Sequence, residues 1–383
     1  MSPLPPAAGS TVLGSPSRAV DADALASALM APRIAGLDFL RALAVALVLL
    51  GHSAESVASL ADLLGVVSGL GVKVFFVLSG FLITRLLFDE LDTHGRVDFR
   101  AFYRRRLARL MPAFYLYLVV AIGILWVRGK PIPWAAVTAS MLYVTNYYQA
   151  FTGAQTNIVA HCWSLAVEEQ FYMLWPLLAA FLVRRRLSMV RALVMIIVAV
   201  WCWRLFLTLQ VQASVDYIYR ALDTRADELA VGCLIAALFR DSKWRERLAV
   251  IMQLPLIGPV LVLLIYASTV MDGQSAVFKY CVGYMVEPIL IGLLMILTVL
   301  AASRTTGWLA AVLNHRVLVH MGQVSYGMYL FHGMIMFTIQ HAVEGRTDNF
   351  WLGFASAFVA VFAFSSAVFR WYETPMRRLI NGH

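Results

Sequence analysis

Apolar runs long enough to cross a lipid bilayer recur along almost the whole of this 383-residue chain. About 20 apolar residues are needed to cross the hydrocarbon core as a helix, at about 1.5 Å per residue. Hydrophobic residues make up 61% of the sequence and charged residues only 14%, against about 25% charged residues in an ordinary soluble domain. The sequence therefore predicts an all-α, polytopic bundle of membrane helices without a second, soluble domain.

We predict about ten membrane spans from these runs. Their approximate bounds are 36–56, 66–88, 107–127, 164–182, 189–209, 225–240, 248–268, 281–302, 318–341 and 351–371. A further apolar stretch, 134–151, is rich in aromatic residues and polar at one end. It is either an eleventh span or a helix at the membrane surface.

Basic residues decide between these two alternatives. With ten spans and a cytoplasmic N-terminus, most loop arginines and lysines face the cytoplasm, as the positive-inside rule requires. An eleventh span would place Arg184, Arg185 and Arg186 outside and would invert every later loop. We therefore predict that both termini are cytoplasmic and that 134–151 is interfacial or re-entrant on the outer face. The same rule explains the net charge of +9, so no nucleic-acid partner is expected.

Two regions of unequal length are expected. Residues 1–33 are rich in Pro, Ala, Ser and Gly and lack the charged-then-apolar order of a signal peptide, which predicts a disordered cytoplasmic tail. Residues 34–383 would form the membrane domain. The four cysteines stand apart from one another and form no CxxC motif or His/Cys cluster, so no metal site is predicted.

Charged residues inside the first predicted span point to a functional site. The segment beginning at residue 36 reads GLDFLRALAVALVLLGHS and contains Arg41 and His52. A charge near the bilayer centre costs about 2.5 kcal/mol or more, so such residues usually face the interior of a bundle. Eleven residues are about three helical turns, which places the two side chains on one helix face, about 16 Å apart along the axis.

The next two spans carry a small-residue pair and a basic cluster. Ser79 and Gly80 interrupt an apolar run and allow another backbone or a ligand to approach. Arg105, Arg106 and Arg109 lie at the start of the third span. Arg106 and Arg109 are neighbours on a helix, and two guanidinium groups at that spacing can bind a phosphate or diphosphate. Both features also have structural interpretations, namely close helix packing and a cytoplasmic anchor near anionic headgroups.

Two later spans contain polar residues with the same ambiguity. Glu168 and Glu169 lie one turn into the fourth span, where they are either part of a site or solvated interfacial residues. In the ninth span, Ser325, Tyr329 and His332 form a polar stripe, which must face protein or water. His332 is either a hydrogen-bonded packing residue or a member of the site.

Taken together, these residues resemble the acyltransferase 3 family of integral membrane acyltransferases over about residues 34–378. The matching motifs are Arg41 with His52, FFVLSGFLI at 75–83, RRLARLMP at 105–112, WSLAVEEQFY at 163–172, TRADELAVG at 224–232, SYGMYLFH at 325–332 and YETP at 372–375. Because the chain stops soon after the last span, we expect it to lack the extracytoplasmic domain that some relatives carry.

The resemblance implies transfer of an acyl group, most often acetyl, from a coenzyme A thioester to a hydroxyl of a sugar or glycan. His52 would be the general base or a transient acyl carrier, assisted by Arg41, Glu168 and Glu169. Acyl-CoA would be a substrate rather than a permanently bound cofactor. The residues expected to bind it are Arg105, Arg106, Arg109, Ser79 and Gly80.

The acceptor glycan is expected to contact Trp163, Ser164, Tyr329 and His332, and the protein is expected in the inner membrane of a bacterium. A transporter or flippase of glycans or lipid-linked intermediates is the alternative function, and a non-catalytic glycan- or lipid-binding module is a further one. A transporter predicts internal symmetry, of which the sequence has no clear trace. Turnover of the donor by purified protein separates an enzyme from both alternatives.

Overall fold

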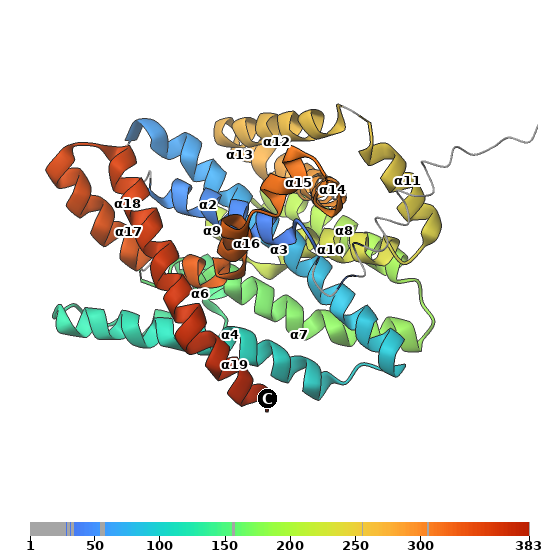
Figure 1. Cartoon of the computed structure of the whole chain (residues 1–383), viewed down its shortest axis with the longest axis horizontal. Coiled ribbons are helices and arrows are strands. Elements are labelled where there is room, and N and C mark those ends of the chain that lie inside the picture. The colour runs from blue at the N-terminus through green and yellow to red at the C-terminus, as the bar shows by residue number, and fades with distance from the viewer. Residues whose placement is uncertain are drawn as a thin grey trace, which may run out of the picture.

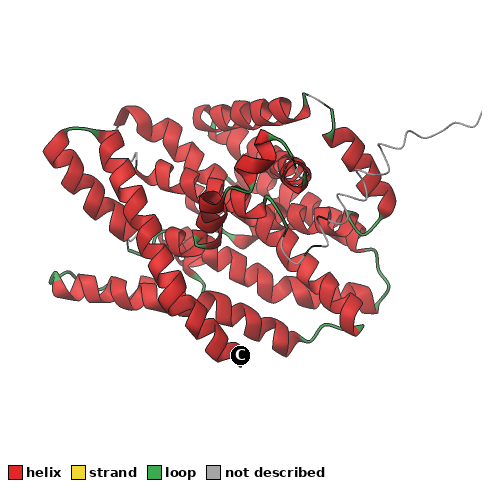
Figure 2. Ribbon diagram, viewed as in Figure 1, coloured by secondary structure: helices red, strands yellow, loops and turns green. Residues whose placement is uncertain are grey.

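The computed structural model of the chain describes residues 28, 31, 34–53, 58–154, 158–254, 256–304 and 306–382. Throughout these residues the chain forms helices joined by turns and short loops, with no strand (Figure 2). The all-α prediction is therefore confirmed. The tail predicted over 1–33 falls almost entirely outside the described residues.

The first half of the bundle contains the helices that later build the site. Their bounds are α2 (Leu37–Ser53), α3 (Ala58–His94), α4 (Phe99–Val127), α5 (Trp134–Met141), α6 (Thr145–Thr152), α7 (Cys162–Arg184), α8 (Met189–Phe206), η2 (Leu207–Val211), α9 (Val215–Arg220) and α10 (Leu222–Leu238). Helix α3 packs against both α2 and α10, so it lies at the centre of this half (Figure 1).

The second half covers α2 and α3 and then returns to α4. Its elements are α11 (Ser242–Met252), α12 (Ile257–Gln274), α13 (Ala276–Phe278), η3 (Lys279–Gly283), α14 (Tyr284–Ser303), α15 (Trp308–Leu313), α16 (Arg316–Gln323), α17 (Ser325–Thr347), α18 (Phe350–Val368), η4 (Phe369–Glu373) and α19 (Thr374–Asn381). Helices α17 and α18 form an antiparallel pair, and the continuous rod from α18 to α19 crosses α4 (Figure 1).

Seven of the described helical segments are long and apolar enough to cross a membrane. They are Leu64–His94, Phe99–Val127, Cys162–Arg184, Met189–Val211, Ile257–Gln274, Ala276–Ser303 and Phe350–Asn381. The chain is a multi-pass membrane protein, but the predicted count of ten spans is not confirmed. Helix α10 has 17 residues, which is about 26 Å and less than a typical hydrocarbon core.

Two predicted spans are divided in the structure. The run 318–341 is split at Val324 between α16 and α17. The run 248–268 is split between α11, which ends at Met252, and α12, which begins at Ile257. In the second case the sequence places Pro255 between the helices, and a residue before proline disfavours helical geometry.

The stretch 134–151 does not form one long helix. It consists of α5 and α6, with a turn at Leu142–Val144 in which Tyr143 has a positive φ of 54°. Each helix has eight residues, about 12 Å, so neither is long enough to cross a bilayer. This agrees with the prediction that 134–151 is not a spanning helix.

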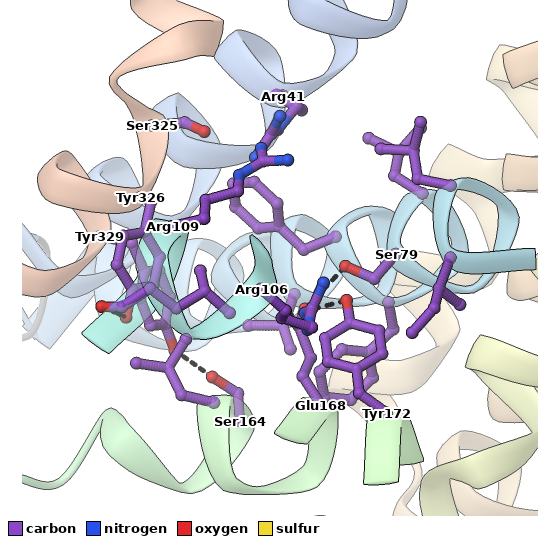
Figure 3. Close-up of a pocket in the computed structure, with 18 of the residues that line it drawn as sticks. Arg41, Ser79, Arg106, Arg109, Ser164, Glu168, Tyr172, Ser325, Tyr326 and Tyr329 are labelled. Carbon is purple, nitrogen blue, oxygen red and sulfur yellow. Dashed lines mark hydrogen bonds between the residues drawn. The ribbon is translucent and has the colours of Figure 1, made fainter. Parts of the chain in front are cut away.

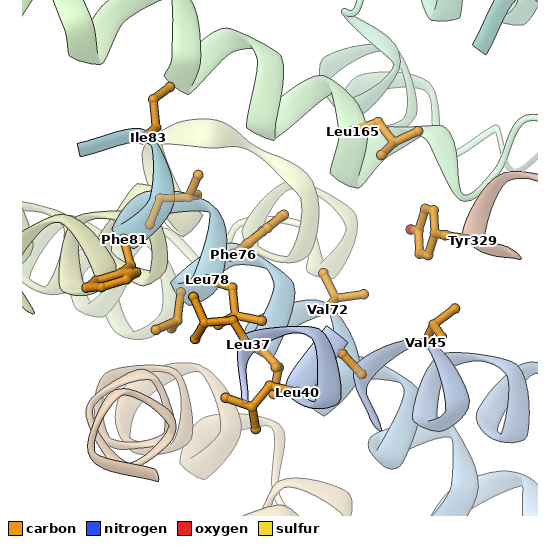
Figure 4. Close-up of a cluster of buried hydrophobic side chains, with 14 of the residues drawn as sticks. Leu37, Leu40, Val45, Val72, Phe76, Leu78, Phe81, Ile83, Leu165 and Tyr329 are labelled. Atoms are coloured by element: carbon orange, nitrogen blue, oxygen red, sulfur yellow. The ribbon is translucent and has the colours of Figure 1, made fainter. Parts of the chain in front are cut away.

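The apolar core is centred on α2 and α3. Leu37, Leu40 and Val45 of α2 face Val72 and Phe76 of α3 in one buried cluster (Figure 4). A side chain at Gly80 would meet the backbone of α10, since a Cβ there would lie 1.9 Å from the Leu229 carbonyl oxygen. Gly80 therefore permits the close crossing of α3 and α10 that fixes the position of the site helices.

Ion pairs are buried inside the apolar bundle as well. Lys73 of α3 contacts Asp272 of α12 at 3.1 Å and also contacts Glu287 of α14. Arg204 of α8 forms two hydrogen bonds to Asp227 of α10, at 3.0 and 2.8 Å. An unpaired charge at such positions would be strongly destabilising, so these pairs link the helices that carry them.

Candidate active site

A pocket opens between helices α2, α3, α4, α7 and α17. The empty space that it encloses together with its opening to solvent is about 800 Å³. The polar residues that line it are Arg41, Ser79, Arg106, Arg109, Ser164, Glu168, Tyr172, Ser325, Tyr326 and Tyr329 (Figure 3). Seven of the thirteen predicted site residues are therefore brought together: Arg41, Ser79, Arg106, Arg109, Ser164, Glu168 and Tyr329.

The first turns of α4 carry the basic side of the pocket. Asp98 caps the helix by accepting a hydrogen bond from the Ala101 N–H at 3.0 Å, and this bond holds the pKa of Asp98 below its usual range. Two turns later, Arg106 and Arg109 lie on one face and both reach the pocket. Arg105 points elsewhere and pairs with Glu90 at 3.3 Å, outside the pocket lining.

Arg106 is held by α7. Its guanidinium lies over the Tyr172 ring, 3.1 Å from the ring centroid, and its Nε is 3.5 Å from Glu169. Glu168 accepts a hydrogen bond from the Ser79 hydroxyl at 3.1 Å and one from the Tyr172 hydroxyl at 3.4 Å. Both glutamates therefore belong to the arginine side of the site, where their charge partly balances the cations.

Arg41 and Arg109 enter the pocket from different helices. Their side chains extend toward one another (Figure 3), and the two guanidinium groups repel each other. Among the described residues Arg109 forms no ion pair and no side-chain hydrogen bond, although Arg106 beside it is paired. Three arginines that reach one pocket, one of them without an ion-pair partner among the described residues, favour an anionic ligand with several oxygens, such as a phosphate or diphosphate.

A hydrogen bond between α7 and α17 closes one end of the pocket. The Ser164 and Tyr329 hydroxyl oxygens are 2.6 Å apart. Both hydroxyls also lie within hydrogen-bond distance of the His161 carbonyl oxygen, at 3.0 Å from Tyr329 and 3.3 Å from Ser164, so one hydroxyl donates to this carbonyl and the other donates to its hydroxyl neighbour. Both residues line the pocket, whereas the histidines behind them do not.

Three histidines lie together on the other side of this closure. The His52 and His332 ring centroids are 5.0 Å apart, and those of His161 and His332 are 5.2 Å apart. Tyr329 packs against His161 at 5.6 Å and against His332 at 5.7 Å. The site thus has an arginine layer and a histidine layer, with Tyr329 between them.

Backbone carbonyls orient two of these rings. His52 Nδ1 is 2.9 Å from the Val48 carbonyl oxygen, and His332 Nδ1 is 2.6 Å from the Tyr329 carbonyl oxygen. A carbonyl only accepts, so both Nδ1 atoms carry the proton and both Nε2 atoms keep a lone pair. Val48, rather than Glu168 or Glu169, therefore makes the hydrogen bond that orients His52.

Gly80 and Trp163, both predicted to bind a ligand, also lie outside the pocket. Gly80 makes the α3–α10 contact described above. Trp163 is buried against Tyr219, with ring centroids 4.9 Å apart, and near the guanidinium of Arg225. Neither residue lines the pocket, so the structure gives both a packing environment.

Sequence reasoning missed His161 and Tyr172, which belong to the two layers. His161 lies directly before α7 and two residues ahead of the WSL motif, and no pattern in the sequence indicated its place in the site. Tyr172 lies four residues after Glu168, a helical spacing that could have indicated their contact. Within the described residues no three His, Cys, Asp or Glu side chains are arranged to hold a metal ion.

Comparison with known proteins identifies the family. The model of the acyltransferase 3 family, described as an acyltransferase domain, matches residues 34–370. The chain belongs to this family. The match spans the pocket and the histidine layer, so both lie within the acyltransferase domain.

Similar proteins carry names that state an activity. The chain is 29% identical to the peptidoglycan O-acetyltransferase OatA of Listeria monocytogenes, over 90% of this chain and 56% of that protein. It is 28% identical to the O-acetyltransferase OatA of Staphylococcus aureus, over 91% of this chain and 58% of that protein. The chain thus spans a little over half the length of these relatives. No solved structure matches it.

Proposed function

We propose that this protein is an integral membrane O-acyltransferase of the bacterial inner membrane. It moves an acyl group, most simply acetyl, from cytoplasmic acyl-CoA to a hydroxyl of a sugar or glycan. The observation that carries the proposal is the layered site: unpaired arginine on one side of Tyr329, and oriented imidazoles on the other. The family match and the names of the relatives support the same class of reaction.

The arginine layer is suited to the phosphates of the donor. Arg106 is held over Tyr172, so it loses little conformational freedom on binding. Arg109 and Arg41 add two forked donors for phosphate oxygens. Acyl-CoA enters and leaves as a substrate in this proposal, and no permanently bound cofactor is required.

The length of the donor matches the separation of the two layers. Arg41 and His52 differ by about 16 Å along α2. A pantetheine arm extends to about 15–20 Å by simple chain geometry. A donor whose phosphates lie at Arg106 and Arg109 would therefore bring its thioester to His52, once the Ser164–Tyr329 hydrogen bond opens.

His52 is the proposed general base. Its Nε2 lone pair accepts the proton of the acceptor hydroxyl as that oxygen attacks the thioester carbonyl. The carbon–sulfur bond then breaks, the sulfur keeps the electron pair, and the imidazolium returns the proton to the thiolate. In the second form of the mechanism, Nε2 itself attacks the thioester, and the acyl-imidazole then transfers its acyl group to the hydroxyl.

The glycan is proposed to approach the histidine layer from the outer side. Ser164, Tyr329 and His332 are the polar groups beside His52 that could hold its hydroxyls. Trp163 lies beneath this surface rather than on it. Glu168 and Glu169 would act on the donor side, by setting the charge and position of Arg106.

The test uses the full chain, purified and reconstituted in proteoliposomes with labelled acetyl-CoA and membrane glycans from a bacterium. We expect release of free CoA together with transfer of label to glycan, and loss of both in His52→Ala. His341→Ala is the matched control, because His341 is exposed near the far end of α17. Normal transfer by well-folded His52→Ala would remove His52 from the mechanism. No turnover of acyl-CoA by wild-type protein with any envelope glycan would refute the proposed function.

A further inference from the structure

The C-terminal helix α19 lies beside the arginine layer. Tyr326, at the start of α17, donates a hydrogen bond to the Leu110 carbonyl oxygen of α4 at 3.2 Å, next to Arg109. One residue later, a Cβ at Gly327 would lie 3.4 Å from Oε1 of Glu373. Glu373 ends η4 and leads directly into α19, which packs on α4. The first turn of α19 is therefore fixed at the edge of the pocket.

Arg377 lies one helical turn after Glu373 and on the same face of α19. It is exposed and lies within electrostatic range of both Arg109 and Glu373. Among the described residues Arg377 forms no ion pair within 4.0 Å. It does not line the pocket. Arg377 is thus a further cation next to the pocket. A ligand too large for the pocket would extend toward it.

Its neighbour Arg378 provides a contrast. The next residue on a helix is rotated by about 100°, so Arg378 points to a different side of α19. It is exposed as Arg377 is. It is not among the charges that act on Arg109 or Glu373. Arg377 and Arg378 carry the same charge on the same helix, but they lie on different sides of α19 relative to the pocket.

We propose that Arg377 binds the phosphomonoester of the CoA donor, the 3′-phosphate on its ribose, and so distinguishes CoA from thioesters that lack it. This inference rests on the proposed function. CoA carries two separate anionic groups, a diphosphate and this phosphomonoester, which the ribose holds apart. Arg41, Arg106 and Arg109 line the pocket, and Arg377 lies beside it on α19.

The charge of the ligand fits this position. A phosphomonoester carries about −1.5 to −2 charges at neutral pH and three strong acceptor oxygens. The Glu373 carboxylate interacts electrostatically with both Arg109 and Arg377. The bound phosphomonoester would supply the second anion that these two arginines lack. Because Arg377 is exposed, its contribution should fall as salt concentration rises.

Anionic lipid headgroups offer the same phosphate chemistry from a second source. Helix α19 has basic residues together with Leu379 and Ile380, which are exposed, so a membrane surface could also contact it. The two sources are separable, because a lipid headgroup does not depend on the ribose phosphate of a soluble ligand.

The experiment measures the Kd of CoA and of dephospho-CoA for the full chain in nanodiscs of neutral lipid, by titration calorimetry. We expect wild-type protein to prefer CoA. Arg377→Ala should weaken CoA binding roughly fivefold to tenfold, the effect of one partly solvated charged contact, and should leave dephospho-CoA unchanged. Arg378→Ala should change neither value. Arg377→Lys should restore part of the preference, since a point charge still attracts phosphate.

Other results would overturn the inference. If Arg377→Ala leaves the ratio of the Kd values for CoA and dephospho-CoA unchanged, Arg377 does not bind the phosphomonoester. The proposed function would still stand in that case, provided that wild-type protein binds CoA. If Arg377→Ala leaves both Kd values unchanged and instead weakens only the interaction of the protein with bilayers rich in phosphatidylglycerol, the lipid headgroup is the ligand of Arg377. If wild-type protein binds neither compound, both the inference and the proposed donor fail together.

Discussion

The hydroxyl oxygens of Ser164 and Tyr329 are 2.6 Å apart, and this contact separates the arginine pocket from the three histidines. It joins α7 to α17, two helices far apart in the sequence. The Tyr329 ring itself touches the rings of His161 and His332. In the proposed mechanism, a donor bound at the arginines would therefore meet His52 only when Tyr329 moves.

Weakening the Ser164–Tyr329 contact should uncouple cleavage of the donor thioester from acyl transfer to the glycan. Tyr329→Phe and Ser164→Ala each leave a buried polar group without its partner, which should lower the free energy of unfolding by about 1–3 kcal/mol. Without the closure, water should reach the donor more easily, so thioester hydrolysis should increase relative to transfer to glycan. Parallel assays of CoA release and of acylated glycan give the ratio. Tyr266→Phe, at an exposed position, is the control, and an unchanged ratio in both site variants would contradict the closure.

The arginine pair is predicted to dominate donor affinity. Each charged hydrogen bond contributes about 1.5–3 kcal/mol, so Arg106→Ala combined with Arg109→Ala should weaken CoA binding by roughly 100-fold or more. Arg109→Lys should lose part of the affinity, because an ammonium cannot reproduce the fork of a guanidinium. Arg104→Ala is the matched control on the same helix, at an exposed position outside the pocket. Wild-type affinity in the double variant would mean that these arginines only anchor the helix.

The buried Lys73 group is predicted to hold the bundle together without taking part in transfer. Lys73→Met leaves Asp272 and Glu287 as uncompensated buried carboxylates, which should destabilise the protein by about 3–5 kcal/mol. Adding Asp272→Asn and Glu287→Gln should recover much of the melting temperature in detergent. If Lys73→Met melts as wild type does, then the ion pairs contribute little to stability.

The fold class and much of the pocket could be predicted from the sequence, because lipid imposes strong rules on composition. Polar residues such as Arg41 and Glu168 stand out in apolar runs, and the family motifs supplied most of the others. The span count could not be predicted as well. The break between α16 and α17, for example, has no proline to reveal it.

Tertiary contacts account for the rest of the differences. Ser79 and Gly80 are adjacent in the sequence, yet one faces Glu168 in the pocket and the other faces the backbone of α10. Glu168 and Glu169 were expected near His52, but both turn toward Arg106 and Ser79. No periodicity in one helix indicates which neighbour lies opposite. For the same reason the clustering of His52, His161 and His332 was visible only in the structure.

Sidedness is predicted by the distribution of basic loops. Single cysteines placed at 96, 186, 212, 274 and 346 in a cysteine-free background all occupy exposed positions. An impermeant maleimide added to intact cells should label 212, 274 and 346 but not 96 or 186. The same reagent after permeabilisation labels all five and serves as the control. Labelling of 186 from outside would reverse the later loops and would require a different path from donor to His52.

The most direct test of the layered site is affinity labelling with bromoacetyl-CoA, whose electrophilic carbon lies next to the acyl carbonyl. If the donor phosphates bind at Arg106 and Arg109 and the acyl end reaches the histidine layer, His52 Nε2 should displace bromide. Mass spectrometry of the digested protein should then find the adduct on the peptide that contains His52. Excess CoA should prevent it, and Arg106→Ala with Arg109→Ala should abolish it. A CoA-protected adduct found elsewhere, with His52 unmodified, would contradict the account.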